Sequence, residues 1–167
     1  PAFASGAEIP QEGTNAALGS GRHLVVEADE SDGSFVVYHP DIAIVTNVQP
    51  DHLDFHGDLA GVEAAYRAFV ASTTPGGLLV ACADDPGARA LAGYARETGR
   101  RVLTYGESED ADLVVQERQE RDAGATARLV VDGVAHELSL AVPGAHNVEN
   151  AAGAFGALTA GCGLSEA

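Results

Sequence analysis

Between residues 42 and 105, short apolar runs alternate with segments of helical period, and this alternation constrains the fold more than any other feature. Residues 42–45, 78–82 and 102–105 have the length and apolar character of buried strands. The segments between these runs place apolar residues three and four positions apart, as an α-helix does. Strands that alternate with helices build parallel sheets, so we predict an α/β fold with a mostly parallel, helix-covered sheet.

Two helices are predicted between these strands. Asp58 is suited to cap the first, which should continue until Thr74-Pro75-Gly76-Gly77 interrupts it. The second should extend from Pro86 to Thr98, because its apolar residues share one side and Gly99 follows it.

The flanking segments have other patterns. Residues 1–21 are rich in Gly, Ser, Ala and Thr without a regular period, and we expect mostly loop there. Residues 126–140 alternate about Asp132-Gly133, a dipeptide that favours a two-residue hairpin turn, so a small antiparallel sheet should be appended to the main one. After a turn at residues 142–147, the alanine-rich residues 148–158 are expected to form a helix.

The charge balance excludes some classes of partner. The chain has 25 acidic and 9 basic residues, a formal charge of −16, and every basic residue is an arginine. Such a field repels phosphate backbones, so we expect neither a nucleic-acid partner nor an anionic membrane. The charge is explained by solubility or by carboxylates gathered to hold cations, and the overall balance does not separate the two.

Cysteine usage and hydropathy favour a cytoplasmic protein. Cys82 and Cys162 each lie in an apolar stretch without a C-x-x-C spacing, so we expect reduced core thiols. The most apolar long stretch, residues 151–162, is shorter than the roughly 20 residues that cross a bilayer, so no membrane span is expected. The first residues lack the charged start and apolar core of a signal peptide.

Four acidic residues directly follow the short apolar run 24–26, which we predict to be a buried strand: Glu27, Asp29, Glu30 and Asp32. Ligands of parallel sheets bind beyond the carboxyl ends of the strands, where this string would lie. Carboxylates this close repel one another unless a cation is near, and Mg²⁺ prefers oxygen ligands. From the residues alone, a solvated acidic loop is the simpler interpretation.

A second polar loop, Asp51-His52-Leu53-Asp54, follows the predicted strand at residues 42–45. His52 and His56 have a spacing that can bind zinc on a helix, but the zinc-protease pattern requires Glu directly after the first His, where Leu53 stands. Without other evidence, a structural role is the simpler interpretation of these histidines.

Asn147 and Asn150 lie at the start of the last predicted helix. An Asn amide donates and accepts hydrogen bonds together, which matches the N6 amino group and N7 of adenine. Helix N-capping is the simpler explanation of Asn147, whereas Asn150 has no such explanation.

Together these segments resemble the Mur ligase family of peptidoglycan precursor synthesis. Four blocks carry the resemblance, in order across nearly the whole chain: GTNAALGSG (13–21), EADESDGSF (27–35), VTN (45–47) with DHLD (51–54), and GAHNVENA (144–151). The block at 27–35 is most similar to the branch of the family that joins L-alanine to UDP-N-acetylmuramate.

The resemblance implies roles for individual residues. Glu27 would bind the Mg²⁺ associated with the ATP phosphates, and His52 would bind a second Mg²⁺ near the acyl phosphate. Four residues would lie at the nucleotide: Asn47, His146, Asn147 and Asn150. Five residues in the first two blocks would help to form the UDP-N-acetylmuramate site: Thr14, Asn15, Asp29, Glu30 and Ser31.

The resemblance also implies a reaction and a domain organisation. ATP would phosphorylate the lactyl carboxylate of UDP-N-acetylmuramate, and the amine of L-alanine would then displace phosphate to form an amide. The family's phosphate loop, a variant of G-x-x-x-x-G-K-[ST], is absent from a chain that has no lysine. We therefore expect residues 1–167 to be the central ATP-binding domain of a three-domain enzyme, to have the other domains as partners, and to be inactive alone.

Two alternatives remain open. The chain could come from another Mur-type ligase, such as the one that recycles murein tripeptide, although the block at 27–35 argues against this. It could also be a non-catalytic module that binds a nucleotide or a metal, for which the missing phosphate loop is the best support.

Overall fold

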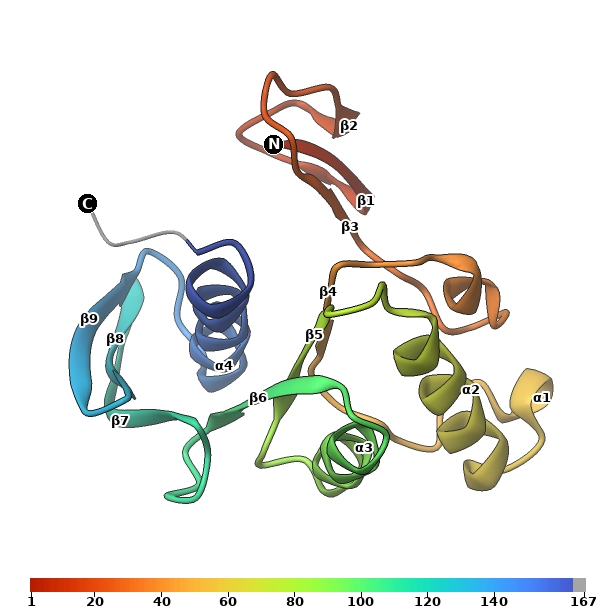
Figure 1. The fold of residues 1–167 in the computed structure, drawn as a ribbon. Helices are drawn as coiled ribbons and strands as arrows, with labels where there is room; N and C mark the ends of the chain where they lie inside the picture. Colours follow the sequence, from red (N-terminus) through yellow and green to blue (C-terminus); the bar gives the residue numbers. More distant parts are fainter. Residues whose placement is uncertain (164–167) are drawn as a thin grey trace.

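The computed structural model describes residues 1–163 and contains two β-sheets (Figure 1). The larger sheet has six strands in sequence order: β4 (Ile42–Val45), β5 (Leu78–Cys82), β6 (Arg101–Gly106), β7 (Leu113–Arg121), β8 (Gly124–Val131) and β9 (Val134–Leu140). The smaller sheet has three strands in the order β2-β1-β3: β1 (Ala2–Ile9), β2 (Thr14–Ala17) and β3 (Leu24–Val26). The helical elements are η1 (Ser34–Val37), α1 (Leu53–His56), α2 (Leu59–Ser72), α3 (Pro86–Glu97), α4 (Ala145–Gly156) and a final π-helical turn, η2 (Ala157–Gly161).

The predicted parallel, helix-covered sheet is confirmed. Strands β4 to β7 pair in parallel, and β5 at their centre is buried at every residue. Side chains alternate between the two faces of a strand, and Val80, Leu103 and Tyr105 all face α4. Helices α2 and α3 pack together on the other side of these strands (Figure 1).

The ends of the predicted helices are confirmed and have local causes. Asp58 caps α2 by accepting a hydrogen bond from the Gly61 amide at 2.9 Å, and α2 ends before the predicted break at Thr74. Asp85 caps α3 in the same way, with Pro86 in the first turn. Helix α4 begins at Ala145, earlier than the expected Val148, so His146 and Asn147 belong to its first turn and not to a preceding loop.

The predicted antiparallel strands are appended edge to edge to the parallel ones. Strand β7 pairs in parallel with β6 and antiparallel with β8, so the hairpin extends the main sheet. Asp132 and Gly133 have φ angles of 51° and 77°, the left-handed conformation that the Asp-Gly turn was expected to supply. A buried layer that includes Leu129 and Ala127 connects this hairpin to the core below α4.

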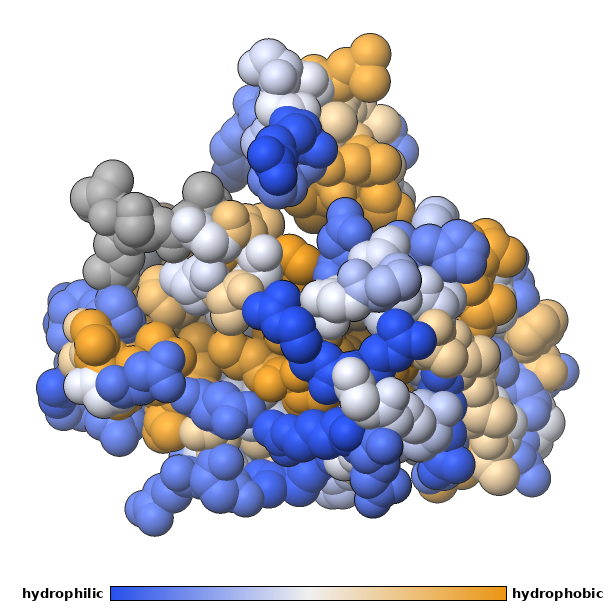
Figure 2. Space-filling model, viewed as in Figure 1, coloured by the Kyte–Doolittle hydropathy of each residue, from blue (hydrophilic) through white to orange (hydrophobic). Residues whose placement is uncertain are grey.

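The N-terminal region differs from the prediction. Residues 1–21, expected to be mostly loop, form β1 and β2, because small residues can pair through their backbones without an apolar period. The strand predicted at residues 24–26 exists as β3, but all of its residues are exposed and it pairs with β1 instead of joining the main sheet. The three-stranded sheet therefore lies apart from the larger sheet (Figure 1), and it displays apolar side chains on its surface (Figure 2).

Helix α4 lies unusually close to the sheet. A Cβ added at Gly153 would meet Cζ of Tyr105 at 2.9 Å, and one at Gly156 would meet Cδ2 of Leu103 at the same distance. A larger residue at either position would push the helix outward. In η2, which continues from the C-terminal end of α4, the Ala160 carbonyl accepts a hydrogen bond from the Arg101 guanidinium of β6 at 3.1 Å.

The structure also describes the two cysteines and the apolar character of the helices. Cys82 is buried and Cys162 is partly buried, and both are free thiols. None of the helices within the described residues combines the length and apolar character needed to cross a membrane.

Candidate functional site

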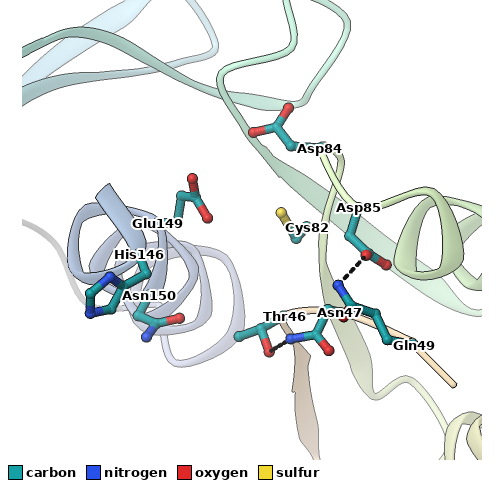
Figure 3. Close-up of a pocket in the computed structure, with 9 residues that line it drawn as sticks. All are labelled: Thr46, Asn47, Gln49, Cys82, Asp84, Asp85, His146, Glu149 and Asn150. Carbon is teal, nitrogen blue, oxygen red and sulfur yellow. Dashed lines mark hydrogen bonds between the residues drawn. The ribbon is translucent and has the colours of Figure 1, made fainter. Parts of the chain in front are cut away.

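A pocket of about 500 Å³ opens where β4 and β5 end and α4 begins (Figure 3). Nine residues line it: Thr46, Asn47, Gln49, Cys82, Asp84, Asp85, His146, Glu149 and Asn150. Ligands of parallel sheets bind beyond the carboxyl ends of the strands because loops and helix N-termini meet there. The pocket therefore lies where the fold is best suited to hold a ligand.

The wall after β4 consists of polar side chains. The Asn47 amide nitrogen donates a hydrogen bond to Thr46 Oγ1 at 3.1 Å, which fixes the orientation of the amide. Gln49 lies next to Asp85, with its Nε2 3.5 Å from the nearer carboxylate oxygen. This wall offers amide donors and acceptors and no positive charge.

The wall after β5 consists of Cys82, Asp84 and Asp85. Burial raises the pKa of the Cys82 thiol, which keeps it protonated and poorly nucleophilic. Both aspartates accept backbone hydrogen bonds from neighbouring loops.

The third wall is formed by the first two turns of α4. Glu149 and Asn150 point from the helix toward the strand ends, whereas the His146 ring points away from them (Figure 3). Asn147 lies outside the pocket, because its Nδ2 donates to the Pro143 carbonyl at 2.7 Å. Asn147 is not the N-cap either, since Gly144 occupies that position without a side-chain cap.

The pocket is lined by acidic side chains. Burial, followed by the charges of Asp84 and Glu107, raises the pKa of Glu149. Within residues 1–163, no hydrogen bond or ion pair reaches the Glu149 carboxylate. The lining has three carboxylates and no arginine, so it suits an uncharged, hydrogen-bonding group better than a phosphate.

A second cluster, the acidic loop with His52, joins residues that the sequence predicted separately. His52 Nε2 lies 3.7 Å from a Glu30 carboxylate oxygen, and His56 Nε2 lies 2.8 Å from the Glu30 carbonyl oxygen. The Ser31 amide donates to Asp29 at 2.8 Å and holds the pKa of that carboxyl below its ordinary value. His52 has a φ of 52°, a left-handed conformation that costs a non-glycine residue about 1–3 kcal/mol and is common at functional sites.

The remaining predicted residues lie on the three-stranded sheet. Glu27 accepts hydrogen bonds from the Gly6 amide and from Ser5 Oγ, each at 2.8 Å, and these donors lower its pKa. In β2, Thr14 Oγ1 donates to the Ala16 carbonyl at 3.1 Å, and Asn15 is exposed. Neither Glu27 nor His52 lines the pocket.

A comparison with protein families assigns this architecture. The profile of the Mur ligase middle domain matches residues 6–158. The chain belongs to the Mur ligase family. The UDP-N-acetylmuramate–L-alanine ligase of Kineococcus radiotolerans is 52% identical over 155 residues, which cover 93% of this chain and 33% of that protein. The chain thus spans about a third of the length of the curated relatives that it matches.

Solved structures have the same fold. The UDP-N-acetylmuramate-alanine ligase MurC of Thermotoga maritima has a TM-score of 0.80 and 28% identity, covering 99% of this chain and 36% of that one. The MurF ligase of the same organism, solved in complex with ADP, has a TM-score of 0.71 and 19% identity, covering 86% of this chain and 34% of that one. The second likeness concerns the fold alone.

The donor atoms of this Mur ligase middle domain can be tested for Mg²⁺. Within residues 1–163, no group of three or more His, Cys, Asp or Glu side chains is arranged to hold a metal. Mg²⁺ needs only one or two protein carboxylates when phosphates and water complete its octahedron. Glu27 fits such a partial site, because its two hydrogen bonds go to Oε2 and leave Oε1 available.

Of the nine residues that line the pocket of this Mur ligase middle domain, only Asn47, His146 and Asn150 were predicted from the sequence as site residues. Asp84 and Asp85 lie one residue beyond a correctly predicted strand. Glu27 and His52 were sought beyond the carboxyl ends of strands, so the same rule could have found the two aspartates. Glu149 carried no signal beyond its place between two noted asparagines. Gln49 and Cys82 were detectable only from the structure.

Proposed function

We propose that this chain is the central, nucleotide-binding part of an ATP-dependent ligase that joins L-alanine to UDP-N-acetylmuramate in the cytoplasm. The observation that carries the proposal is the pocket at the strand ends, which is lined by Asn47, just after β4, and by Asn150 of α4. Its family membership and its identity to L-alanine ligases support the same reaction. The other domains of the full-length protein would complete the active site.

The pocket suits the adenosine part of ATP. Adenine presents an amino donor and ring-nitrogen acceptors, and an Asn amide can satisfy one of each. Asn47 is held by Thr46, so its amide is oriented before a ligand arrives. Glu149 adds a carboxylate that can accept a hydrogen bond from an amino or hydroxyl group of the nucleoside.

The triphosphate would extend away from this acidic pocket. Mg²⁺ would neutralise the charge that gathers on the transferred phosphoryl group. Glu27 would hold one ion, and His52 would hold the second. Asp29, Glu30 and Ser31 lie in the same loop region as His52, so we propose that this region contacts UDP-N-acetylmuramate, together with Thr14 and Asn15 of β2.

The experiment compares two asparagines of α4 in the full-length protein. Asn150→Ala removes an amide that lines the pocket, and we expect the Kd for ATP to rise about tenfold, the size of one or two lost hydrogen bonds. Asn147→Ala is the matched control, because its amide is bonded to Pro143 outside the pocket. Calorimetric titration with ATP measures both, and equal losses in the two variants would reject the pocket as the nucleotide site.

Acceptor choice separates the proposal from its alternatives. Release of ADP by the full-length protein should depend on L-alanine and not on murein tripeptide, as the 52% identity to L-alanine ligases indicates. Dependence on the tripeptide would favour the recycling ligase. ATP binding without release of ADP under either condition would favour a non-catalytic module.

A further inference from the structure

Two consecutive aspartates, Asp84 and Asp85, lie just beyond β5, which is one of the two inner strands of the parallel part of the sheet. The side chains of Asp84 and Asp85 both line the pocket, but they point away from each other (Figure 3). Each reaches the loop that follows a neighbouring strand. The loop after β4 lies on one side of β5, and the turn after β6 lies on the other.

Asp85 connects the loop after β4 to helix α3. One of its oxygens accepts hydrogen bonds from the Val48 amide at 3.0 Å and from the Ala88 amide at 2.7 Å. The other lies 3.5 Å from Gln49 Nε2 (Figure 3). The carboxylate thus caps α3 and, by a separate bond, holds the loop that carries Asn47.

Asp84 holds the turn after β6 through hydrogen bonds to its backbone. One of its oxygens accepts from the Glu107 amide at 2.6 Å. The other accepts from the Ser108 amide at 2.9 Å and from the Ser108 hydroxyl at 2.6 Å.

A glycine makes room for each of these contacts. A Cβ at Gly106 would lie 2.3 Å from an Asp84 carboxylate oxygen, so only glycine lets that carboxylate approach. A Cβ at Gly87 would lie 2.2 Å from the Val48 carbonyl oxygen, so only glycine lets α3 approach the loop after β4. The two aspartates and the two glycines form one arrangement, repeated on both sides of β5.

The hydrogen bonds of these carboxylates separate them from Glu149. Asp84 and Asp85 together hold backbone amides at four positions: Val48, Ala88, Glu107 and Ser108. Glu149 accepts no hydrogen bond from the described part of the chain. The acidity of the pocket therefore has two origins: the Asp84 and Asp85 carboxylates hold backbone amides, whereas the Glu149 carboxylate has no hydrogen-bond partner among the described residues.

We infer that Asp84 and Asp85 are positioning residues, which hold the loops after β4 and β6 at the spacing that the nucleotide requires. The inference rests on the proposed nucleotide site. Neither aspartate needs to touch the nucleotide or its metal. Asp85 acts through the Val48 amide, which fixes the backbone next to Asn47.

Three substitutions at Asp85 in the full-length protein separate positioning from simple helix capping. Ser is as good an N-cap as Asp, but its shorter side chain cannot also reach the Val48 amide. Asn keeps an oxygen for both amides, and Ala keeps neither bond. Thermal unfolding, the Kd for ATP and the hydrogen exchange of the Val48 amide are measured for each variant.

We expect the Kd for ATP and the Tm to rank the three Asp85 variants differently. Asp85→Ser should raise the Kd for ATP about tenfold and expose the Val48 amide to exchange, with a Tm close to that of Asp85→Asn. Asp85→Ala should lose both affinity and Tm, and Asp85→Asn should keep the affinity within about twofold. If the Kd follows the Tm through the series, Asp85 is only a cap and the inference is wrong.

Two further variants test the inference without changing Asp85, so that a loss of stability in the Asp85 variants cannot explain the result. Asp58→Ser replaces the equivalent cap of α2 outside the pocket, and it should leave the Kd for ATP unchanged. Gly87→Ala displaces the loop after β4 without altering a carboxylate, and it should raise the Kd as Asp85→Ser does. An unchanged Kd in Gly87→Ala would overturn the inference, whereas a wild-type protein that binds no ATP would overturn the proposed function itself.

Discussion

Strands β5 and β3 have similar sequences and opposite environments. Leu78–Cys82 and Leu24–Val26 are both short apolar runs followed by acidic residues. Leu79 in β5 is 1% exposed, with a strand on each side and helices on both faces, whereas Leu24 in β3 is 64% exposed. Strand β3 has β1 as its only partner among the described strands.

The comparison shows that an apolar run predicts a strand more reliably than it predicts burial. Burial depends on what covers the two faces, which a run of three residues does not encode. The carboxylates that follow the two strands differ in the same way. The carboxylates after β5 hold backbone amides in a packed framework, while Glu27 after β3 is held by two donors on an exposed sheet.

The largest expected difference comes from the same substitution in both strands. Leu79→Ala should lower the free energy of unfolding by about 3 kcal/mol, because it leaves a cavity in the core. Leu24→Ala should change it by less than about 0.5 kcal/mol. Urea unfolding of both variants tests the comparison, and equal losses would mean that β3 is covered in solution.

An intermediate effect is expected where the packed region buries a polar atom. Tyr105 is fully buried, and its hydroxyl has no hydrogen-bond partner in the described structure. Tyr105→Phe should therefore raise the free energy of unfolding by about 1 kcal/mol. Thermal unfolding measures this change. Tyr38→Phe, at a residue that is 43% exposed, is the control and should leave the free energy of unfolding unchanged. A Tyr105→Phe variant less stable than the wild type would indicate that the hydroxyl binds a water molecule.

The smallest effect concerns Glu27. The Gly6 amide and the Ser5 hydroxyl lower its pKa, so its contribution to stability is present above the ordinary Glu pKa of about 4.5. That contribution is lost as the pH falls through the lowered value. It should be small, because the carboxyl is almost fully solvated.

An NMR titration of the Glu27 carboxyl carbon measures this pKa directly. Ser5→Ala is the control, since it removes one donor and should move the pKa part of the way back toward its ordinary value. An ordinary pKa in the wild-type protein would show that the three-stranded sheet is not formed around Glu27 in solution.

Local chemistry explains which parts of the fold could be predicted. The helix caps at Asp58 and the turn at Asp132-Gly133 depend on a few adjacent residues, and both were predicted correctly. The pairing of β1 with β3 depends on backbone groups far apart in the sequence, and no side-chain period marks it. The early start of α4 at Ala145 was missed because Gly144, and not a side-chain cap, begins it.

The candidate site was predicted in part for the same reasons. Asn47 and His146 were found through the resemblance, and Asn150 also through its amide chemistry. The structure brings these three residues to one pocket. Asn147 was expected at the nucleotide, but its amide donates to the Pro143 carbonyl and it does not line the pocket. Glu27 and His52 remain predicted metal ligands, each with its own neighbours in the structure.

The glycine contacts of α4 have a consequence for how this protein can vary. Glu149 and Asn150 project from the same rigid helix that rests on Tyr105 through Gly153, one turn farther along. The distance across the pocket is thus set in part at a buried position that does not line the pocket. A methyl group added at Gly153 would push α4 away from Tyr105, and so change the shape of the pocket without altering any residue that lines it.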